Sequence, residues 1–328
     1  MKSEKYPISN IEKDTQIGIL TTTYSGALQA AKRAAYCHRV FRILKRIPLN
    51  SDKKNITRLL VRDITFNNHL LPGATFCVRV HRIQNTRQEY ETLALEAEIG
   101  AAIKRETTTN SVDLEHPNIT FILLFSKEEA FFGIELYKRP RGVFIERNPN
   151  ERPFYMPGTL EPQFARLLAN LARCSPDNFL LDPFCGPGGI LIEGAVMGCK
   201  VIGNDLNEEM TKGAKQNIQY YAPKVFPELI MGDARTLPLR SKSINAIATD
   251  PPYGRVSSSY GNSIPHLLED FLGNTRDFLA DNALVAIAMT KDVPIKSIIE
   301  SAGYEILHLE DMFIHGSLTR RIGVCKVK

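Results

Sequence analysis

Asn178-Phe-Leu-Leu-Asp182-Pro-Phe-Cys-Gly186-Pro-Gly188-Gly189 is the stretch that decides the fold of this 328-residue chain. Its apolar start predicts a short strand, and its three glycines let the backbone turn tightly and approach a ligand at the strand end. No Lys-Ser/Thr pair follows the glycines, which argues against a P-loop and a bound triphosphate. A glycine-rich turn is a weak signal by itself, so the surrounding chain has to support it.

Apolar runs alternate with helical patterns from residue 161 onward. We expect helices at 161–173, 189–198, 207–221, 264–280 and 293–302, and strands at 178–182, 199–204, 228–231, 244–249 and 282–289. This alternation predicts an α/β domain with a parallel, doubly wound sheet. Two final extended runs, at 304–314 and 320–327, predict a hairpin that adds an antiparallel strand to that sheet.

Acidic residues follow three further strands of the predicted sheet. Asp205 ends the second strand, where its carboxylate is placed to accept hydrogen bonds from both hydroxyls of a ribose. Asp233 follows the third strand and could accept from the amino group of an adenine. Asp250-Pro-Pro-Tyr253 follows the fourth, and its prolines stiffen the backbone, so that a carboxylate, fixed carbonyls and an aromatic face suit a planar ring with an amino group. A Pro-rich turn that only closes a strand is the alternative.

The first half of the chain predicts a mixed α+β binding module. We expect helices at 25–47 and 89–106, and strands at 57–64, 75–83, 112–114, 119–125 and 130–137. Gly100 inside the second helix suggests that another backbone packs closely against it. Residues 1–150 contain 23 Lys and Arg against 16 Asp and Glu, whereas residues 151–328 contain 18 against 20. The first half is therefore the one expected to meet a polyanion.

Two basic segments each allow two interpretations. The run 32–54 interleaves Lys and Arg with Tyr36 and Phe41, which fits nucleic-acid binding or a solvated basic helix face. Residues 139–160 are rich in Pro and Gly and predict an ordered linker. Its arginines either line a seam that faces phosphates or are solvated side chains of a plain linker: Arg139, Arg141, Arg147 and Arg152.

Cysteine usage and hydropathy limit the class of protein. The six cysteines include no C-x-x-C pair, which argues against a disulfide framework and a zinc site, so we expect reduced, mostly buried thiols. Cys185 in the glycine loop is expected to be a packed side chain and not a nucleophile. No apolar run is long enough to span a bilayer, and residues 1–14 lack the apolar core of a signal peptide. We therefore expect a cytoplasmic protein with no membrane partner and no metal.

The order of these motifs resembles that of the class I S-adenosylmethionine-dependent methyltransferases, and Asp250-Pro-Pro-Tyr253 resembles the signature of enzymes that methylate exocyclic amino groups of nucleobases. Four segments together resemble the archaeal tRNA (guanine-10) N2-methyltransferases: 152–160, 182–193, 250–255 and 315–320. Four others resemble a THUMP domain, an RNA-binding module that a ferredoxin-like domain precedes in this family: 75–80, 99–103, 112–117 and 132–136. The chain departs from the family in reading Gly-Pro-Gly-Gly where Gly-Thr-Gly-Gly is commoner, and in an N-terminal segment that is short for a complete ferredoxin-like domain.

The resemblance implies four regions: a ferredoxin-like region at 1–60, a THUMP domain at 61–145, a linker at 146–160 and a Rossmann-like methyltransferase domain at 161–328. The sheet of the last domain has seven strands in this family, with an antiparallel last strand. The resemblance further implies a monomer that uses S-adenosylmethionine and tRNA and, as for some relatives, a small activating subunit. The residues implied to bind the cofactor are Asp182, Phe184, Gly186, Gly188, Gly189, Asp205, Leu206, Asp233 and Ala234.

The implied catalytic residues are Asp250, Pro251, Pro252 and Tyr253. Asp250 and a proline carbonyl would accept hydrogen bonds from the guanine N2 amino group, Asp250 would take the released proton, and Tyr253 would stack on a base that has left its helix. Two other functions stay open: methylation of guanine N2 in ribosomal RNA or at another tRNA position, and RNA binding or assembly without catalysis. The number of methyl groups, one or two, also stays open.

Two short segments near the implied site each keep two explanations. The turn from His315 to Arg320 either closes a hairpin or folds onto the rim of the active site. Arg255 with Ser257–Ser259 is either a mobile substrate loop or flexible surface.

Overall fold

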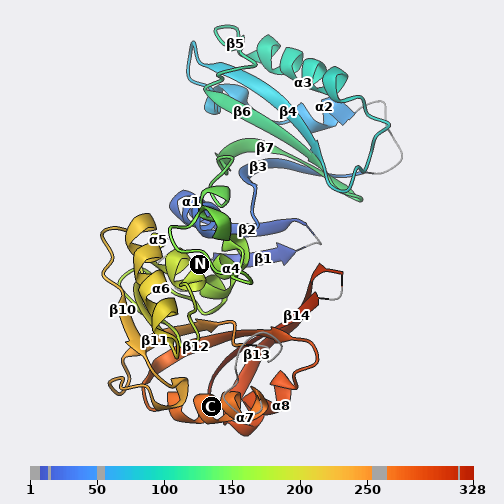
Figure 1. Cartoon of the computed structure of the whole chain (residues 1–328). Helices are drawn as coiled ribbons and strands as arrows, with labels where there is room; N and C mark the ends of the chain where they lie inside the picture. The colour runs from blue at the N-terminus through green and yellow to red at the C-terminus, as the bar shows by residue number, and fades with distance from the viewer. Residues whose placement is uncertain (1–7, 14–15, 50–55, 253–263, 317) are drawn as a thin grey trace. The chain divides into compact units, whose positions relative to one another are not determined.

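The computed structural model describes residues 8–13, 16–49, 56–252, 264–316 and 318–328. The chain divides into two compact units (Figure 1), of which the smaller contains residues 8–32 and 37–139 and the larger contains residues 33–36 and 140–328. The domain limits expected from the sequence stay predictions.

A seven-stranded sheet forms the centre of the larger unit, in the order β10-β9-β8-β11-β12-β14-β13. The first five of these strands run parallel, and β14 pairs antiparallel with both β12 and β13. The parallel α/β sheet and the terminal hairpin predicted from the sequence are confirmed. The strands are β8 (Phe179–Asp182), β9 (Lys200–Asp205), β10 (Glu228–Met231), β11 (Ile244–Thr249), β12 (Leu279–Thr290), β13 (Tyr304–His315) and β14 (Leu318–Val327).

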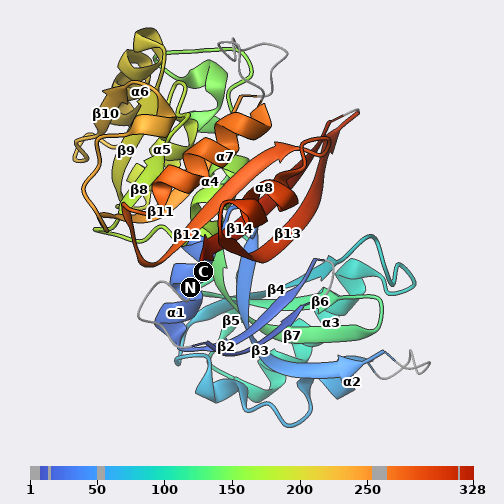
Figure 2. The ribbon, with the colours of Figure 1, turned by 90° about the horizontal axis from the view of Figure 1, so that it is seen from below.

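Helices cover both faces of this sheet, which is why the central strands β8, β11 and β12 are mostly apolar and buried. Leu180 and Leu181 are adjacent on β8 and enter opposite apolar layers, because successive strand residues point to opposite faces. One layer is closed by α4–α6 and the other by α7 and α8, which lie in front of the strands in Figure 2. The helices are α4 (Pro162–Leu171), α5 (Gly189–Val196), α6 (Glu208–Tyr221), α7 (Ile264–Thr275) and α8 (Ile295–Ser301), with short 3-10 turns at Ile145–Arg147, Pro149–Glu151 and Ala234–Thr236.

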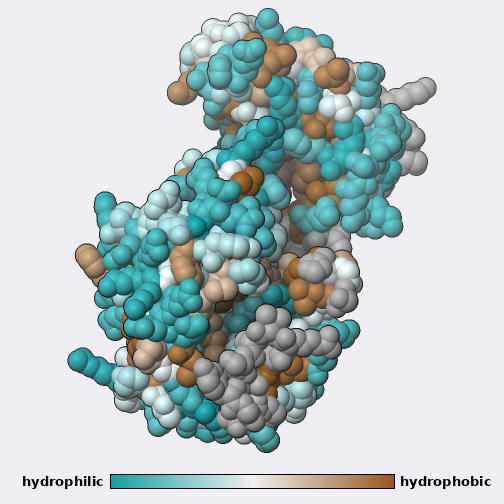
Figure 3. All heavy atoms as spheres, viewed as in Figure 1, coloured by the Kyte–Doolittle hydropathy of each residue, from teal (hydrophilic) through white to brown (hydrophobic). Residues whose placement is uncertain are grey.

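Helix α6 is amphipathic in the way the sequence pattern predicts, whereas residues 189–195 of α5 are all buried. On α6, Met210, Ala214 and Ile218 are buried, and charged side chains cover the outer face. Figure 3 shows a mostly hydrophilic surface where α6 lies in Figure 1. Within the described ranges, every helix is too short or too polar to span a bilayer.

The strand order places a switch point between β8 and β11. The chain moves from β8 outward through β9 to β10, and then returns to the other side of β8 as β11. Crossover helices leave the two neighbouring strands in opposite directions there, so a crevice opens at their carboxyl ends. The glycine loop after β8 and the Asp250-Pro-Pro turn after β11 both lie at this crevice.

The smaller unit contains a five-stranded sheet in the order β3-β7-β6-β4-β5 and a two-stranded ribbon of β1 and β2. Four phenylalanines, Phe66, Phe76, Phe121 and Phe132, pack edge-to-face or stacked in its core. The predictions of α3, β4, β6 and β7 are confirmed. Its elements are β1 (Ile8–Lys13), β2 (Gly18–Thr22), α1 (Tyr24–Arg33), β3 (Arg39–Pro48), α2 (Ile56–Val61), η2 (Phe66–Asn68), β4 (Thr75–Arg82), α3 (Thr92–Glu106), β5 (Ser111–Val112), β6 (Ile119–Phe125) and β7 (Glu129–Lys138).

Three predictions for this unit are wrong. Residues 25–47 are not one helix, because α1 ends at Arg33 and β3 pairs along its whole length with β7. The apolar residues of β3 are mostly β-branched or aromatic, and this strand pairing overrides their helical spacing. Residues 57–64 form no strand, because residues 57–61 belong to α2. Gly100 meets no close backbone, since a Cβ built there has nothing within 4 Å.

The basic run 32–54 is partly neutralised within the unit. Arg39 pairs with Glu135, and Arg46 donates to both carboxylate oxygens of Glu129 at 2.7 and 2.8 Å. The alternative of a solvated basic helix face is wrong, because these arginines lie on strand β3. Nucleic-acid binding by this run stays a prediction.

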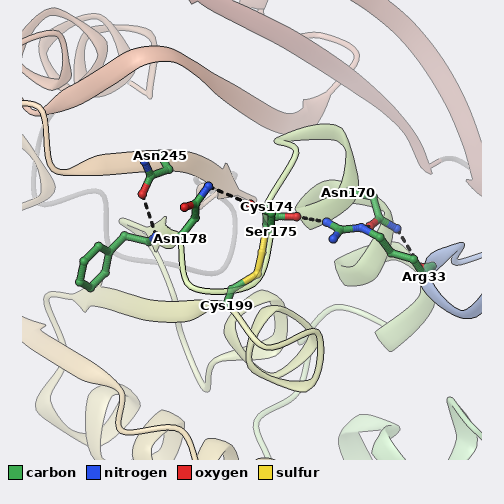
Figure 4. Close-up of a disulfide and its surroundings, with 8 residues drawn as sticks. Arg33, Asn170, Cys174, Ser175, Asn178, Cys199 and Asn245 are labelled. Atoms are coloured by element: carbon green, nitrogen blue, oxygen red, sulfur yellow. Dashed lines mark hydrogen bonds between the residues drawn. A yellow bond between two sulfur atoms is a disulfide. The ribbon is translucent and has the colours of Figure 1, made fainter. Parts of the chain in front are cut away.

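Cys174 and Cys199 form a disulfide in the larger unit (Figure 4), so the expectation of reduced thiols is wrong for this pair. Cys174 follows α4 and Cys199 precedes β9, and the crossover through α5 brings their Cα atoms to 6.6 Å. Arg33 donates to the carbonyl of Cys174 and, at 2.9 Å, to the side chain of Asn170. The cysteines with free thiols among the described residues are Cys37, Cys77, Cys185 and Cys325.

Candidate active site

A cavity of about 980 Å³ lies at the crevice of the larger unit. Ten of the thirteen residues that the sequence implies for the site line it: Asp182, Phe184, Gly186, Gly189, Asp205, Leu206, Asp233, Ala234, Asp250 and Pro252. Gly188 and Pro251 belong to the same two turns. Tyr253 lies outside the described residues, as do Arg255 and Ser257–Ser259.

The glycine loop between β8 and α5 has a conformation that requires glycine. Gly186 and Gly188 have φ values of +48° and +83°, in the left-handed region. A Cβ on Gly188 would lie 3.1 Å from the Cβ of Ala214, so α6 packs directly against the loop. Asn217 of α6 also donates to the carbonyl of Pro187 at 3.0 Å. The loop is therefore held in place before any ligand arrives.

Asp205 at the end of β9 is tied to the glycine loop. Its Oδ2 accepts from the backbone N–H of Gly186 at 3.0 Å, and its Oδ1 accepts from that of Asn207 at 2.9 Å. Each carboxylate oxygen has two acceptor sites, so both can still receive a hydroxyl. The carboxylate is thus oriented and remains competent to bind a ribose.

Asp233 is engaged by a residue that the sequence analysis did not single out. Arg235 donates to both of its carboxylate oxygens, with Nε–Oδ1 at 3.0 Å and Nη2–Oδ2 at 2.6 Å. These hydrogen bonds lower the pKa of Asp233 below its ordinary value. An adenine amino group would share this carboxylate with Arg235.

Asp182 joins β8 to β11 at the switch point. It is 2% exposed, and its Oδ1 accepts from Thr249 Oγ1 at 2.8 Å and from the Phe184 N–H at 3.2 Å. Burial raises the pKa of Asp182 to about 7, although both hydrogen bonds oppose the shift. The residue is placed to hold the two turns of the site together.

Asp250 stands at the end of β11 with its two oxygens in different surroundings. Oδ2 accepts from Nη1 of Arg320 at 2.5 Å, whereas Oδ1 is buried and has no hydrogen-bond partner among the described residues. Burial raises the pKa of Asp250 to about 6, and Arg320 opposes the shift. At neutral pH the carboxylate is therefore mostly ionised, and its Oδ1 accepts no hydrogen bond from the described part of the chain.

The linker preceding α4 forms part of the cavity wall through residues 156–160. The ring of Phe154 covers Gly213, where a Cβ would come within 2.1 Å of it. Asn217 accepts from the N–H of Phe154 at 2.8 Å and donates to its carbonyl at 2.9 Å. The segment is therefore fixed to the same helix as the glycine loop.

Both interpretations of the linker arginines are wrong for Arg147 and Arg152, which are 8% and 5% exposed and face neither phosphate nor solvent. Arg147 donates to Glu193 at 2.6 Å, and Arg166 donates to the same carboxylate at 2.8 Å. Arg152 donates to the carbonyl of Arg147 at 3.0 Å. The buried carboxylate of Glu193 thus pairs with two of these arginines, Arg147 and Arg166, and no linker pattern in the sequence indicates it.

Comparison with known proteins identifies the family. Residues 149–322 match the family model described as an RMKL-like methyltransferase domain, and residues 57–135 match that of the THUMP domain. The tRNA (guanine(10)-N2)-dimethyltransferase of Methanothermobacter thermautotrophicus is 31% identical over 324 residues, which cover 99% of this chain and 92% of the relative. The enzyme of the same description from Pyrococcus abyssi is 34% identical over 248 residues, which cover 75% and 72%. The chain belongs to this family of THUMP-containing methyltransferases.

Solved structures support the methyltransferase fold. TrmN from Thermus thermophilus has a TM-score of 0.50 at 24% identity, covering 89% of this chain and 84% of that one. SMU.472, a putative methyltransferase complexed with SAH, has a TM-score of 0.50 at 13% identity, covering 97% and 92%.

Four features of this methyltransferase site escaped the sequence analysis as site residues: Asn204, Arg235, Arg320 and the segment 156–160. Asn204 lines the cavity and donates to the carbonyls of Pro183 and Gly232, both at 3.0 Å, and so joins the ends of β8 and β10. The resemblance of 152–160 and 315–320 to family segments was the signal that could have indicated the last two. His315 pairs with Leu318, so the turn closes the hairpin, and Arg320 on β14 is the residue of this segment that contacts Asp250; Ser317 lies outside the described residues.

Proposed function

We propose that this protein transfers one or two methyl groups from S-adenosylmethionine to the N2 amino group of a guanine in tRNA, specifically guanine 10. The observation that supports it most is the position of Asp250 in the wall that also contains the glycine loop and Asp205, with an Oδ1 that has no hydrogen-bond partner among the described residues. The family relatives named tRNA (guanine(10)-N2)-dimethyltransferase support the choice of nucleotide.

The cavity fits the proposed methyl donor. Gly186 lines the cavity and has no side chain where a ligand would approach. Asp205 would accept from the ribose hydroxyls, and Phe184 and Asp233 would border the adenine. When bound, S-adenosylmethionine supplies an electrophilic methyl group on its sulfonium. The structural role of Asp182 in holding β8 against β11 would keep the donor pocket and the Asp250 turn in register.

Asp250 would orient the amino group of the target base. The N2 lone pair of guanine is delocalised into the ring, so the nitrogen needs alignment to act as a nucleophile. Oδ1 of Asp250 would accept one amino hydrogen, and the carbonyl of Pro251 or Pro252 would accept the other. The ionised carboxylate would then take the proton that the nitrogen loses on methylation. Stacking of Tyr253 on the base is part of this proposal and concerns a residue outside the described ranges.

The smaller unit would bind the tRNA, since it contains the residues that match a THUMP domain and belongs to the basic half of the chain. The target guanine would have to leave its helix to reach the cavity. We further propose that the protein acts as a monomer in the cytoplasm, and that a small activating subunit is an additional component to test.

Mass mapping of methylated RNA tests the proposal. The purified chain is incubated with methyl donor and either a tRNA transcript or the same transcript with adenine at position 10. Methylation that maps to N2 of guanine 10 and disappears in the adenine transcript is the expected result. Methylation at another guanine, or only in a ribosomal RNA pool, would contradict this target. Absence of transfer with and without a candidate activating subunit would favour a non-catalytic RNA-binding protein.

A further inference from the structure

Arg320 reaches the site from a distant part of the sheet. It lies near the start of β14, opposite Thr290 of β12, and β12 separates it from β11 and Asp250. Two strand spacings of about 4.8 Å amount to roughly 10 Å, which only long side chains bridge. The 2.5 Å contact between Arg320 Nη1 and Asp250 Oδ2 therefore extends across the neighbouring strand β12.

The guanidinium of Arg320 is held on more than one side. It lies over the ring of Phe164 of α4, with Cζ 5.0 Å from the ring centroid, and the residue is 8% exposed. A flat guanidinium stacks on an aromatic face and keeps its donors in one plane, which an ammonium group cannot do. Phe164 thus restricts the directions in which Arg320 can donate.

The carboxylate of Asp250 is consequently asymmetric. Oδ2 is neutralised by Arg320, while Oδ1 is buried without a partner in the described part of the chain. A buried acceptor without a donor costs about 1–3 kcal/mol, so its retention points to a donor that arrives with a ligand. The amino group of a base is such a donor.

We propose that Arg320 is a positioning residue for the methyl transfer proposed above: its guanidinium, held by Phe164, fixes one oxygen of Asp250 so that the other receives the amino group of the target base. This role depends on the proposed function and extends it to a residue some 70 positions away in the chain. Arg320 would act through Asp250 and touch neither the base nor the donor.

The charges around Asp250 predict how Arg320 affects the pH dependence. Arg320 faces Asp250 from β14, and Asp182 faces it from β8 and also interacts with Asp205 of β9. The wider cavity wall adds Glu208, Asp233 and Arg235. Because Arg320 is the cation that opposes the effect of burial on the Asp250 pKa, its loss should make the carboxylate ionise only at higher pH.

A purely structural ion pair would behave differently. Removal of one partner of a buried ion pair destabilises a protein, because the other charge is left buried without compensation. Loss of a structural pair would lower the unfolding temperature and reduce activity equally at every pH. Loss of a positioning residue should change the rate and its pH dependence while leaving donor binding intact.

The test compares single-turnover methyl transfer to tRNA by Arg320→Gln and Arg320→Lys with that of the wild type. Arg321→Gln is the matched control, because Arg321 is the next residue on β14 and pairs with Asp311 of β13 at 2.7 and 3.0 Å. It removes the same charge from the same strand without touching Asp250. Donor affinity by calorimetry and the unfolding temperature are measured for each variant.

The expected loss for Arg320→Gln is about 100-fold in rate at pH 7, with donor affinity within about twofold of wild type. The deficit should narrow as the pH rises to 9. The rate of Arg320→Lys should be about tenfold below that of wild type, because the planar guanidinium is lost. Its decrease in rate at low pH should match that of wild type, because the positive charge remains. Arg321→Gln should keep the wild-type rate and pH profile.

Three results would overturn the role of Arg320. The first is a wild-type rate in Arg320→Gln, and the second is a rate loss in this variant that is the same at every pH. The third applies if Arg320→Gln does not fold, and is an Arg320→Lys variant with the wild-type rate at every pH. A wild-type chain that transfers no methyl group to tRNA would instead overturn the proposed function, and the role of Arg320 with it.

Discussion

Lowering the pH from 7 to 5 tests whether the ionised carboxylate of Asp250 takes part in the methyl transfer. Burial raises the pKa of this carboxyl to about 6 in spite of Arg320. A group with this pKa is about 90% ionised at pH 7 and about 10% ionised at pH 5. Because only the ionised form accepts the proton from the amino group, the single-turnover rate should fall about tenfold over these two pH units.

The assay keeps the protein in excess over tRNA at a saturating concentration of methyl donor, so that product release and donor affinity do not enter the rate. Saturation matters because Asp182, whose pKa burial raises to about 7, titrates in the same range beside the donor pocket. Asp250→Asn preserves the shape of the side chain without its charge. Its rate at pH 7 should be at least about 100-fold below that of wild type and should not change between pH 5 and 7.

A wild-type rate that stays constant from pH 5 to 7, in protein that circular dichroism shows to be folded, would refute the role of Asp250 as proton acceptor. So would an Asp250→Asn variant that retains the wild-type rate. If the fall in rate at low pH disappears in Asp182→Asn and persists in Asp250→Asn, the titrating group is Asp182 and the role of Asp250 as proton acceptor is refuted.

Three further perturbations test the structure around the site. Gly188→Ala should weaken donor binding at least tenfold in calorimetry, because φ is +83° and the new Cβ would lie 3.1 Å from Ala214; Gly273→Ala in α7, where a Cβ meets nothing within 4 Å, is the control and should leave donor binding unchanged. Cys174→Ser should lower the free energy of unfolding by about 3 kcal/mol in urea titrations without reductant, since the disulfide closes a loop between residues 25 positions apart; an equal midpoint in both proteins would contradict this. Asp182→Asn should gain stability relative to wild type as the pH rises from 4 to 7. The raised folded-state pKa of Asp182 stabilises the wild type fully below the unfolded-state pKa, and this contribution is lost as the pH rises to about 7, at about 1.4 kcal/mol per pH unit. A constant difference in urea midpoint over this range would contradict the burial argument.

The methyltransferase half of the fold was predictable because local rules act consistently along it. Strands β8, β10 and β11 are short, mostly apolar and followed by a turn with Gly, Asp or Pro, so β10 and β11 were predicted to the residue. Strand β3, residues 39–48, was not predicted, because the spacing of its apolar residues fits a helix as well as a strand. Only its pairing with β7 distinguishes the two structures. Periodicity fails where a partner strand decides the structure.

The candidate site divides in the same way. The sequence by itself determined the glycine loop, Asp205, Asp233 and the Asp250-Pro-Pro turn, because backbone constraints of Gly and Pro and the carboxyl ends of parallel strands are local properties. Only the tertiary structure decided that Arg235 donates to Asp233 and that Arg147 is buried with a hydrogen bond to Glu193. The disulfide between Cys174 and Cys199 likewise depends on it. It also decided that Arg320 meets Asp250, since an antiparallel β14 starts at the edge where the parallel strands end. Such contacts depend on which strands are neighbours, and no spacing along a single chain encodes that order.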